Sequence, residues 1–175
     1  MQNLHGSHFV SRMRMIGTLT IHVRDVRTGR VIRVWKKRNT ITYDAGDVVR
    51  DLLAQRATDY APAELQLGSM RFCTNATAAT SGDTNLLNEI ASVRRQLTDL
   101  HKLSGGVGEI SLHATMEGSA GNGYTYREAG LFTKGTVWNA DVGGSLQMFS
   151  RQVHPTIEKT AAVALEYDWT LQFTV

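Results

Sequence analysis

The last thirteen residues of the chain alternate between apolar and more polar side chains. Apolar residues occupy every odd position from Val163 to Val175, and the even positions carry mostly polar residues. A period of two places successive side chains on opposite faces of an extended strand. The pattern predicts a long strand with one buried and one solvated face, which is typical of an antiparallel sheet.

Residues 17–26 show the same alternation, with the apolar side chains again at odd positions. Residues 31–35 resume it after a polar turn in which Gly29 supplies a positive φ. Two alternating runs joined by such a turn predict a β-hairpin. Residues 108–118 predict another clean strand, and extended stretches favour strands at 65–74, 92–103, 124–132 and 145–153.

One helix is predicted, over residues 44–53. Asp44 is a suitable N-cap, and apolar residues recur at helical spacing at Val48, Val49, Leu52 and Leu53. Asp83 is expected to cap a brief helical turn that ends at Leu87. The elements together predict a mainly β fold, an antiparallel β-sandwich or open barrel with one short α-helix packed on it.

Residues 1–15 lack any periodicity, so we interpret them as an N-terminal arm that precedes a single β-rich domain at 16–175. The arm carries apolar side chains that are costly to leave in water, together with arginines. We therefore expect it to become ordered against a neighbouring subunit. The candidate inter-subunit contacts are Leu4, Phe9, Val10, Arg12, Met13 and Arg14.

The composition, 42% hydrophobic and 20% charged residues, is that of a globular protein rather than a disordered one. A net charge of +3 does not by itself favour nucleic acid as a partner. The single cysteine, Cys73, excludes an internal disulfide. Since no apolar run suits a signal peptide or a bilayer span, we expect synthesis in the cytoplasm and no membrane contact.

Candidate chemistry is sparse. No family signature surrounds Cys73, which we interpret as a small buried hydrophobic residue. The glycine-rich segment 118–123 lacks the lysine and hydroxyl residue of a phosphate loop and is expected to be a turn. His22 and His113 fall on polar strand faces and are expected to be solvated. We therefore predict no catalytic residue, no metal ligand and no cofactor.

Glu128 is the acid that stands out, because it precedes an apolar run, Ala129 to Phe132. A carboxylate in such a place is partly desolvated and needs a partner. We interpret it as a structural carboxylate that accepts a hydrogen bond or forms an ion pair.

The basic run of Lys36, Lys37 and Arg38 follows Trp35. Such a run can contact nucleic acid through charge and stacking. It more often marks the end of an edge strand, where lysines prevent unwanted pairing, and we favour this second interpretation.

Four motifs occur in order over the chain from residue 39 onward. They are Asn39-Thr-Ile-Thr-Tyr-Asp-Ala-Gly46 before the helix, Met70-Arg-Phe72 with a threonine-rich loop reaching Asp83-Thr-Asn-Leu86, Arg127-Glu-Ala-Gly-Leu-Phe132, and Pro155-Thr-Ile-Glu-Lys-Thr160 with Leu165-Glu-Tyr-Asp-Trp-Thr-Leu171. This succession resembles small tail-associated structural proteins, of the baseplate or fibre-attachment type, in tailed bacteriophages and prophages. The segment Cys73-Thr-Asn-Ala-Thr77 departs from the glycine-threonine run usual there, and residues 1–38 are not covered.

The resemblance implies a non-enzymatic virion protein that assembles the tail, baseplate or fibre attachment by self-association and by docking other virion proteins. It supplies no catalytic residues. Two alternatives remain open, a capsid cement or decoration protein and a carbohydrate-binding module of a receptor-binding fibre. The second would need exposed aromatic side chains around a groove, for which Trp35, Tyr124 and Trp138 are the candidates.

Overall fold

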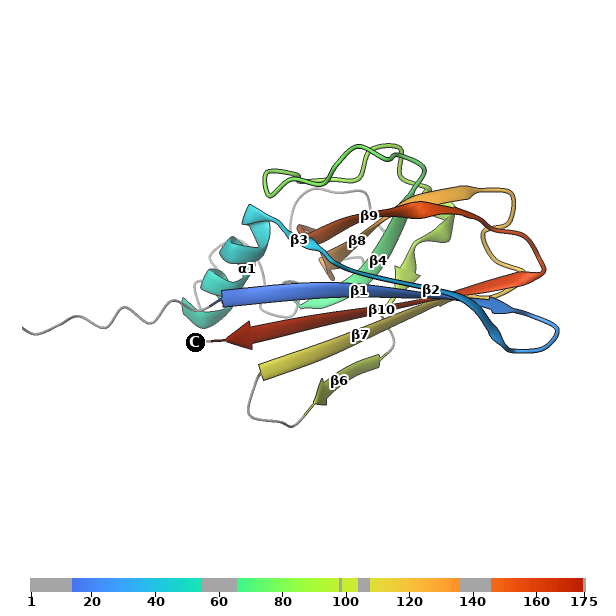
Figure 1. The fold of residues 1–175 in the computed structure, drawn as a ribbon. Helices are drawn as coiled ribbons and strands as arrows, with labels where there is room; N and C mark the ends of the chain where they lie inside the picture. Colours follow the sequence, from blue (N-terminus) through green and yellow to red (C-terminus); the bar gives the residue numbers. More distant parts are fainter. Residues whose placement is uncertain (1–13, 55–65, 98, 104–107, 136–145, 175) are drawn as a thin grey trace, which may run out of the picture.

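The computed structural model describes residues 14–54, 66–97, 99–103, 108–135 and 146–174. Two antiparallel sheets pack face to face as a sandwich (Figure 1), so the predicted mainly β fold is confirmed. Sheet A has the order β2-β1-β10-β7-β6, with β1 at Arg14–Asp25, β2 at Val31–Arg38, β6 at Asp99–Leu103, β7 at Gly108–Met116 and β10 at Val163–Thr174. Sheet B has the order β3-β9-β8-β4-β5, with β3 at Thr40–Ile41, β4 at Leu67–Cys73, β5 at Arg95–Gln96, β8 at Thr125–Thr133 and β9 at Met148–Glu158.

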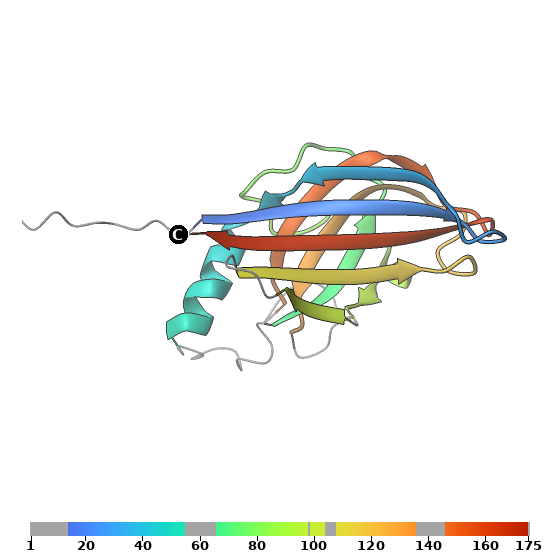
Figure 2. The ribbon, with the colours of Figure 1, turned by 60° about the horizontal axis from the view of Figure 1, so that its bottom comes forward.

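The predicted hairpin is the β1–β2 pair at one edge of sheet A (Figure 2). Its turn is closed by Asp25, whose carboxylate accepts hydrogen bonds from the backbone N–H and the hydroxyl of Thr28 at 2.7 and 2.8 Å. Gly29 has the expected positive φ, 67°. β1 starts at Arg14, which pairs with Thr174, so the strand begins two residues before the boundary expected for the arm.

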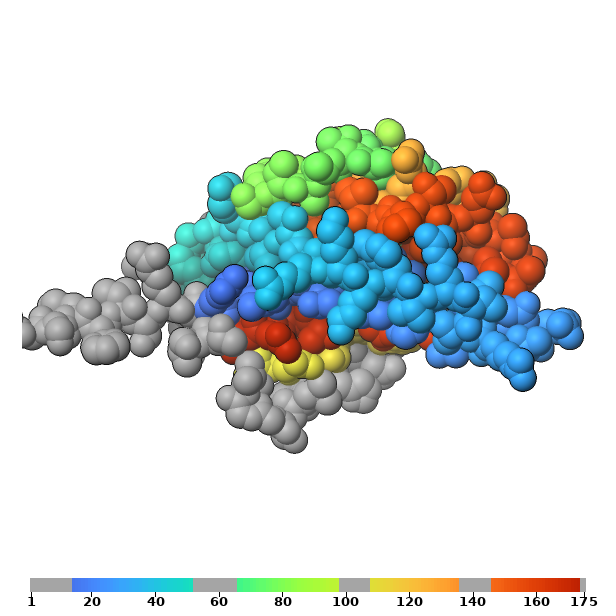
Figure 3. Space-filling model, viewed as in Figure 1, coloured from blue at the N-terminus to red at the C-terminus, as the bar shows by residue number. Residues whose placement is uncertain are grey.

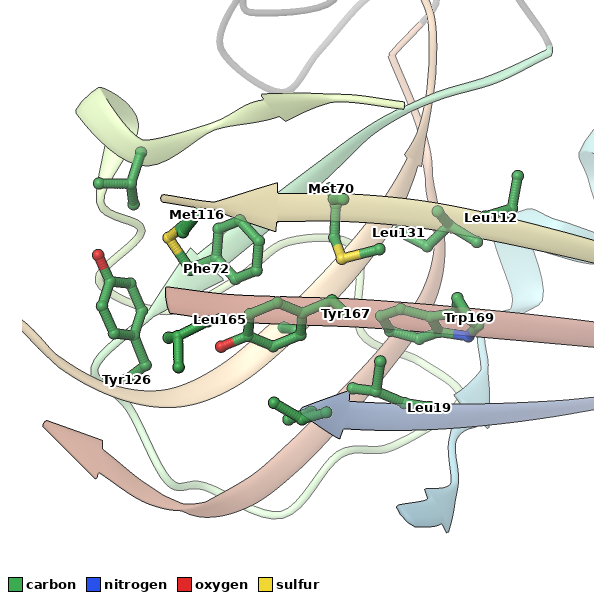
Figure 4. Packing of buried hydrophobic residues seen from close by; sticks show 14 of the residues in the cluster. Leu19, Met70, Phe72, Leu112, Met116, Tyr126, Leu131, Leu165, Tyr167 and Trp169 are labelled. Atoms are coloured by element: carbon green, nitrogen blue, oxygen red, sulfur yellow. The ribbon is translucent and has the colours of Figure 1, made fainter. Parts of the chain in front are cut away.

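The core fills the space between the inner faces of the two sheets (Figure 4). Trp169 of β10 lies between its register partners Leu19 of β1 and Leu112 of β7, and all three are at most 1% exposed. Phe72 of sheet B meets Tyr167 of sheet A with ring centroids 4.7 Å apart. The odd-numbered face of the last strand is therefore the buried face, as its alternation predicts.

The predicted helix is α1, Tyr43–Ala54, which packs beside β9 at one end of the sandwich (Figure 2). Asp44 is not its N-cap, because the helix starts one residue earlier and the hydroxyl of Thr42 accepts the N–H of Ala45 at 3.4 Å. Val48 is buried against the core as expected, whereas the side chains of Leu52 and Leu53 lie outside the described part of the chain. No helix in the described ranges has the length and apolar character needed to cross a bilayer.

Two local predictions are wrong. Residues 84–87 form no helical turn, because the carboxylate of Asp83 bonds back to the N–H and hydroxyl of Thr80 at 2.7 and 2.9 Å. The strand expected at 92–103 is instead divided into a 3-10 turn, η1 at Ala91–Val93, the short β5 and then β6. Since β5 belongs to sheet B and β6 to sheet A, the chain crosses between the sheets within this segment.

Candidate functional site

The outer face of sheet B carries a charged cluster under a long loop, residues 74–90. Cys73 of β4 and Glu128 of β8 are register partners, so their side chains point to the same face of the sheet. Both have no exposed surface. The loop arches over β4, β8 and β9, as the green segment at the top of Figure 1 shows. A carboxylate is thus enclosed between a sheet and its cover.

Arg151 of β9 neutralises this carboxylate. Its Nε donates to Glu128, one of its terminal nitrogens donates to Asp83, and the other donates to the carbonyl oxygen of Thr77 at 3.1 Å. The exposed fractions of the Glu128, Arg151 and Asp83 side chains are 0%, 2% and 22%. One guanidinium therefore ties two neighbouring strands of sheet B to both ends of the loop segment 77–83.

A second branch is centred on Glu89. Its carboxylate accepts Arg94 at 2.5 and 3.0 Å and Arg71 at 3.4 Å. The guanidinium of Arg71 also stacks over the ring of Phe132, 4.7 Å from its centroid. The three arginines and three acids of the two branches have equal and opposite formal charge. We call these six side chains the buried ionic network; they are Arg71, Asp83, Glu89, Arg94, Glu128 and Arg151.

The network holds Arg151 and Asp83 in their charged forms. Burial alone would lower the pKa of Arg151, but hydrogen bonds to Glu128 and Asp83 hold it above its ordinary value. Burial likewise acts to raise the pKa of Asp83, yet the hydrogen bonds from Thr80 and Arg151 outweigh it, and this pKa is lowered. Arg151 and Asp83 therefore form a permanent ion pair rather than a site that exchanges protons near neutral pH.

Cys73 is unsuited to act as a nucleophile. Burial raises the pKa of its thiol, and the hydrogen bond from Sγ to Glu128 at 2.6 Å raises it further. Reactive cysteines need a lowered pKa and solvent access, and Cys73 has neither. The interpretation of Cys73 as a buried small residue agrees with this geometry, although its thiol also donates to the network.

The loop is packed onto the sheet as well as ion-paired to it. Leu86 joins Phe132, Met148, Leu146 and Cys73 in a small apolar cluster that is separate from the main core. A Cβ atom on Gly130 would lie 2.9 Å from Leu86 Cδ2 and 2.8 Å from the Phe132 ring. Glycine at this position therefore lets the loop approach the sheet closely.

A second polar cluster lies on the outer face of sheet A. Asp168 of β10 bridges His113 on β7, with Nδ1 at 2.7 Å, and His22 on β1, with Nε2 at 3.3 Å. His113 also contacts the hydroxyl of Thr115 at 2.8 Å. Both histidines lie on the outer face as expected, with the side chains of His22 and His113 28% and 33% exposed, and the register of β1, β10 and β7 also brings an acid between them. In the described ranges, no three His, Cys, Asp or Glu side chains are arranged to hold a metal ion.

The sequence-predicted contacts of the arm are only partly described. Arg14 lies exposed at the start of β1, whereas Leu4, Phe9, Val10, Arg12 and Met13 lie outside the described residues, so their role stays a prediction. Of the aromatic candidates for sugar binding, Trp35 is half-buried with its ring 5.9 Å from that of His154, and Tyr124 is 41% exposed. Trp138 is not among the described residues.

The buried arginines were not predicted from the sequence. Arg71 and Arg151 stand in β-like runs, where a lone charged residue is ordinarily on the solvated face. Searches for related proteins give no assignment: no family model matches the sequence, and no curated protein or solved structure matches it.

Proposed function

We propose that the chain is a non-enzymatic structural subunit of a tailed bacteriophage virion, which acts in assembly of the tail, baseplate or fibre attachment. It would do so by self-association and by docking other virion proteins. The observation that carries the proposal is the open edge of sheet A. Among the described strands β2 pairs with β1 alone, and its Ile32 and Val34 are 60% and 56% exposed.

Exposed β-branched side chains on an unpaired strand edge are a hazard for a protein that works alone. They are expected on a protein whose edge is covered by a neighbour in an assembly. The sequence resemblance to tail-associated proteins suggests that this neighbour is another virion protein.

The buried ionic network supports the same proposal. Its charged groups are paired and covered by the loop, and the thiol beside Glu128 has a raised pKa, which is the opposite of activation. A network of this kind fixes a loop onto a sheet. Such fixation suits a rigid building block that must present the same surfaces in every copy.

Native mass spectrometry of the purified full-length chain tests the proposal. We expect a closed homo-oligomer of one defined size that persists on dilution. A chain that stays monomeric at every concentration and joins no other virion protein would contradict it. Detectable hydrolysis of glycan or peptidoglycan that is abolished by Glu128→Gln in a folded variant would also contradict it.

A further inference from the structure

The backbone of β2 has free hydrogen-bonding groups on its outer side. The N–H of Asn39 donates to the carbonyl oxygen of Gly17 at 3.1 Å, so Asn39 and Gly17 are a hydrogen-bonded pair of the β1–β2 ladder. In an antiparallel ladder such pairs alternate with pairs that are not hydrogen-bonded. The N–H and C=O groups of Val34, Lys36 and Arg38 therefore point away from β1. They offer a ladder of donors and acceptors to one further strand.

The side chains of β2 make the surface around this ladder both apolar and basic. Ile32 and Val34 are largely exposed, and the band of β2 lies across the middle of the face shown in Figure 3, between β9 above it and β1 below it. The eight residues of β2 include four basic side chains and no acidic one. Within the described ranges, Lys36, Lys37 and Arg38 form no ion pair with a carboxylate.

The positive charge of β2 indicates which kind of strand can pair with it. Two copies of β2 placed edge to edge would bring eight basic side chains together with no acid between them, since each copy contributes four. Such pairing is disfavoured, because like charges on neighbouring strands repel. An extended segment with acidic side chains would instead gain both the backbone hydrogen bonds and the charge attraction.

A groove next to the end of β2 gives such a segment room. Among the described residues, β3 pairs with Ser150 and Arg151 of β9, and Gln152 and Val153, which follow them, line a groove together with Lys37 and Arg38. The groove has a volume of about 300 Å³. It is lined by Lys37, Arg38, Thr40, Ala76, Ala78, Ala79, Gln152 and Val153. Two cations above an alanine-rich wall suit a carboxylate on a short aliphatic stem.

We propose that β2 accepts an acidic, extended segment of a partner protein as a sixth, antiparallel strand of sheet A. Its acids lie beside Lys36 and Arg38, on the face of β2 that also carries Val34, and its apolar residues lie beside Trp35 on the opposite face. This inference rests on the proposed function and names the chemistry of its partner. Because β2 repels its own copies, self-association uses a different surface.

The probe is a fluorescently labelled peptide in which glutamate alternates with valine, long enough to span β2. Its binding to the full-length chain is followed by fluorescence anisotropy. We expect saturable binding that weakens as salt is raised, and slower amide hydrogen exchange at Val34 and Lys36 in the complex. A peptide with lysine in place of glutamate should not bind, nor should a scrambled peptide of the same composition.

Two variants separate the backbone from the charge. Val34→Pro removes an outward N–H and leaves the hydrogen bonds to β1 in place, since proline is tolerated on edge strands. Lys36→Glu with Arg38→Glu reverses the charge. Each should weaken peptide binding by at least roughly tenfold. The matched control, Arg127→Glu at an exposed position of β8, should bind as the parent does. Circular dichroism verifies that each variant is folded.

Several results would overturn the inference. They are no binding of the acidic peptide, equal binding of the lysine peptide, unchanged exchange at Val34 and Lys36, or a single-stranded oligonucleotide that binds β2 more tightly than the peptide. If the peptide fails while the full chain still forms a defined oligomer, the strand-acceptor inference is wrong and the proposed function stands. If the peptide binds but the chain assembles with nothing, the proposed function is wrong and β2 remains a peptide-binding edge.

Discussion

The Sγ atom of Cys73 lies 2.6 Å from a carboxylate oxygen of Glu128, and neither side chain has exposed surface. The thiol donates to a carboxylate that also accepts Arg151. A negative partner opposes thiolate formation, so this contact favours a neutral cysteine. Together with Arg151, the pair helps to hold the loop 74–90 on sheet B.

Cys73 should resist alkylation in the folded protein. Iodoacetamide reacts with the thiolate, and burial together with Glu128 raises the pKa of this thiol. Labelling followed by mass spectrometry at mildly alkaline pH should be slow in buffer and rapid in urea, where the chain is unfolded. Comparable rates in the two conditions would show that Cys73 is accessible and would contradict the enclosed geometry.

Arg151→Met should strongly destabilise the fold. It leaves Glu128 buried without its cation, and breaking a buried ion pair from one side costs about 3–5 kcal/mol. Urea denaturation gives the free energy of unfolding. The matched control is Arg24→Met, which removes the partly exposed partner of Glu166 and should cost less than about 1 kcal/mol. Equal losses in the two variants would refute the structural role of the network.

His154 should make the fold less stable in mild acid. It lies between the rings of Trp35 and Tyr167, and burial lowers its pKa to about 4. Between these two pKa values the unfolded chain, with a histidine pKa near 6.5, therefore binds a proton at His154 that the native chain does not bind. Stability is retained above the unfolded pKa and falls as the pH drops toward 4. The expected loss from this residue is about 2 kcal/mol between pH 7 and pH 5.

His154→Phe provides the comparison, since it keeps a ring in this position and removes the titration. The unfolding free energy of the variant, measured at both pH values, should lack that part of the pH dependence. If the two proteins lose the same stability between pH 7 and pH 5, the protonation of His154 does not contribute.

Deleting residues 1–13 should leave the fold intact and weaken assembly. β1 begins at Arg14, so the deletion removes no strand residue. The apolar side chains of the arm would otherwise be buried against a neighbouring copy, and that burial would be lost. Native mass spectrometry should show a folded monomer in place of the oligomer. A truncated chain that assembles as well as the full chain would exclude the arm as an inter-subunit contact.

The strands could be predicted because their alternation is local. Leu19 and Trp169 are found on the inner face because period two alone decides which face is buried. The partners of Glu128 could not be predicted in the same way. Arg151 and Asp83 reach it only through the β8–β9 register and the path of the loop, which are set by contacts between distant parts of the chain. The His22–Asp168–His113 cluster was missed for the same reason.

The helix start and the Asp83 turn show a second limit. An acid before an apolar run fits both a helix cap and a loop bond, and local sequence does not separate them. At Asp83 the hydrogen bond from Thr80 within the loop forms instead of a helix cap, because Arg151 of β9 binds the same carboxylate. At Tyr43 the helix begins early, because Thr42 already supplies the capping hydroxyl.

The most direct test of a virion role is to quantify the protein in purified tailed particles from the host that carries its gene, by mass spectrometry against labelled peptide standards. A structural subunit of the tail should be present in a fixed number of copies per particle, and it should stay with isolated tails when heads are removed. A protein that is found in the soluble lysate but is absent from purified particles would contradict the proposal.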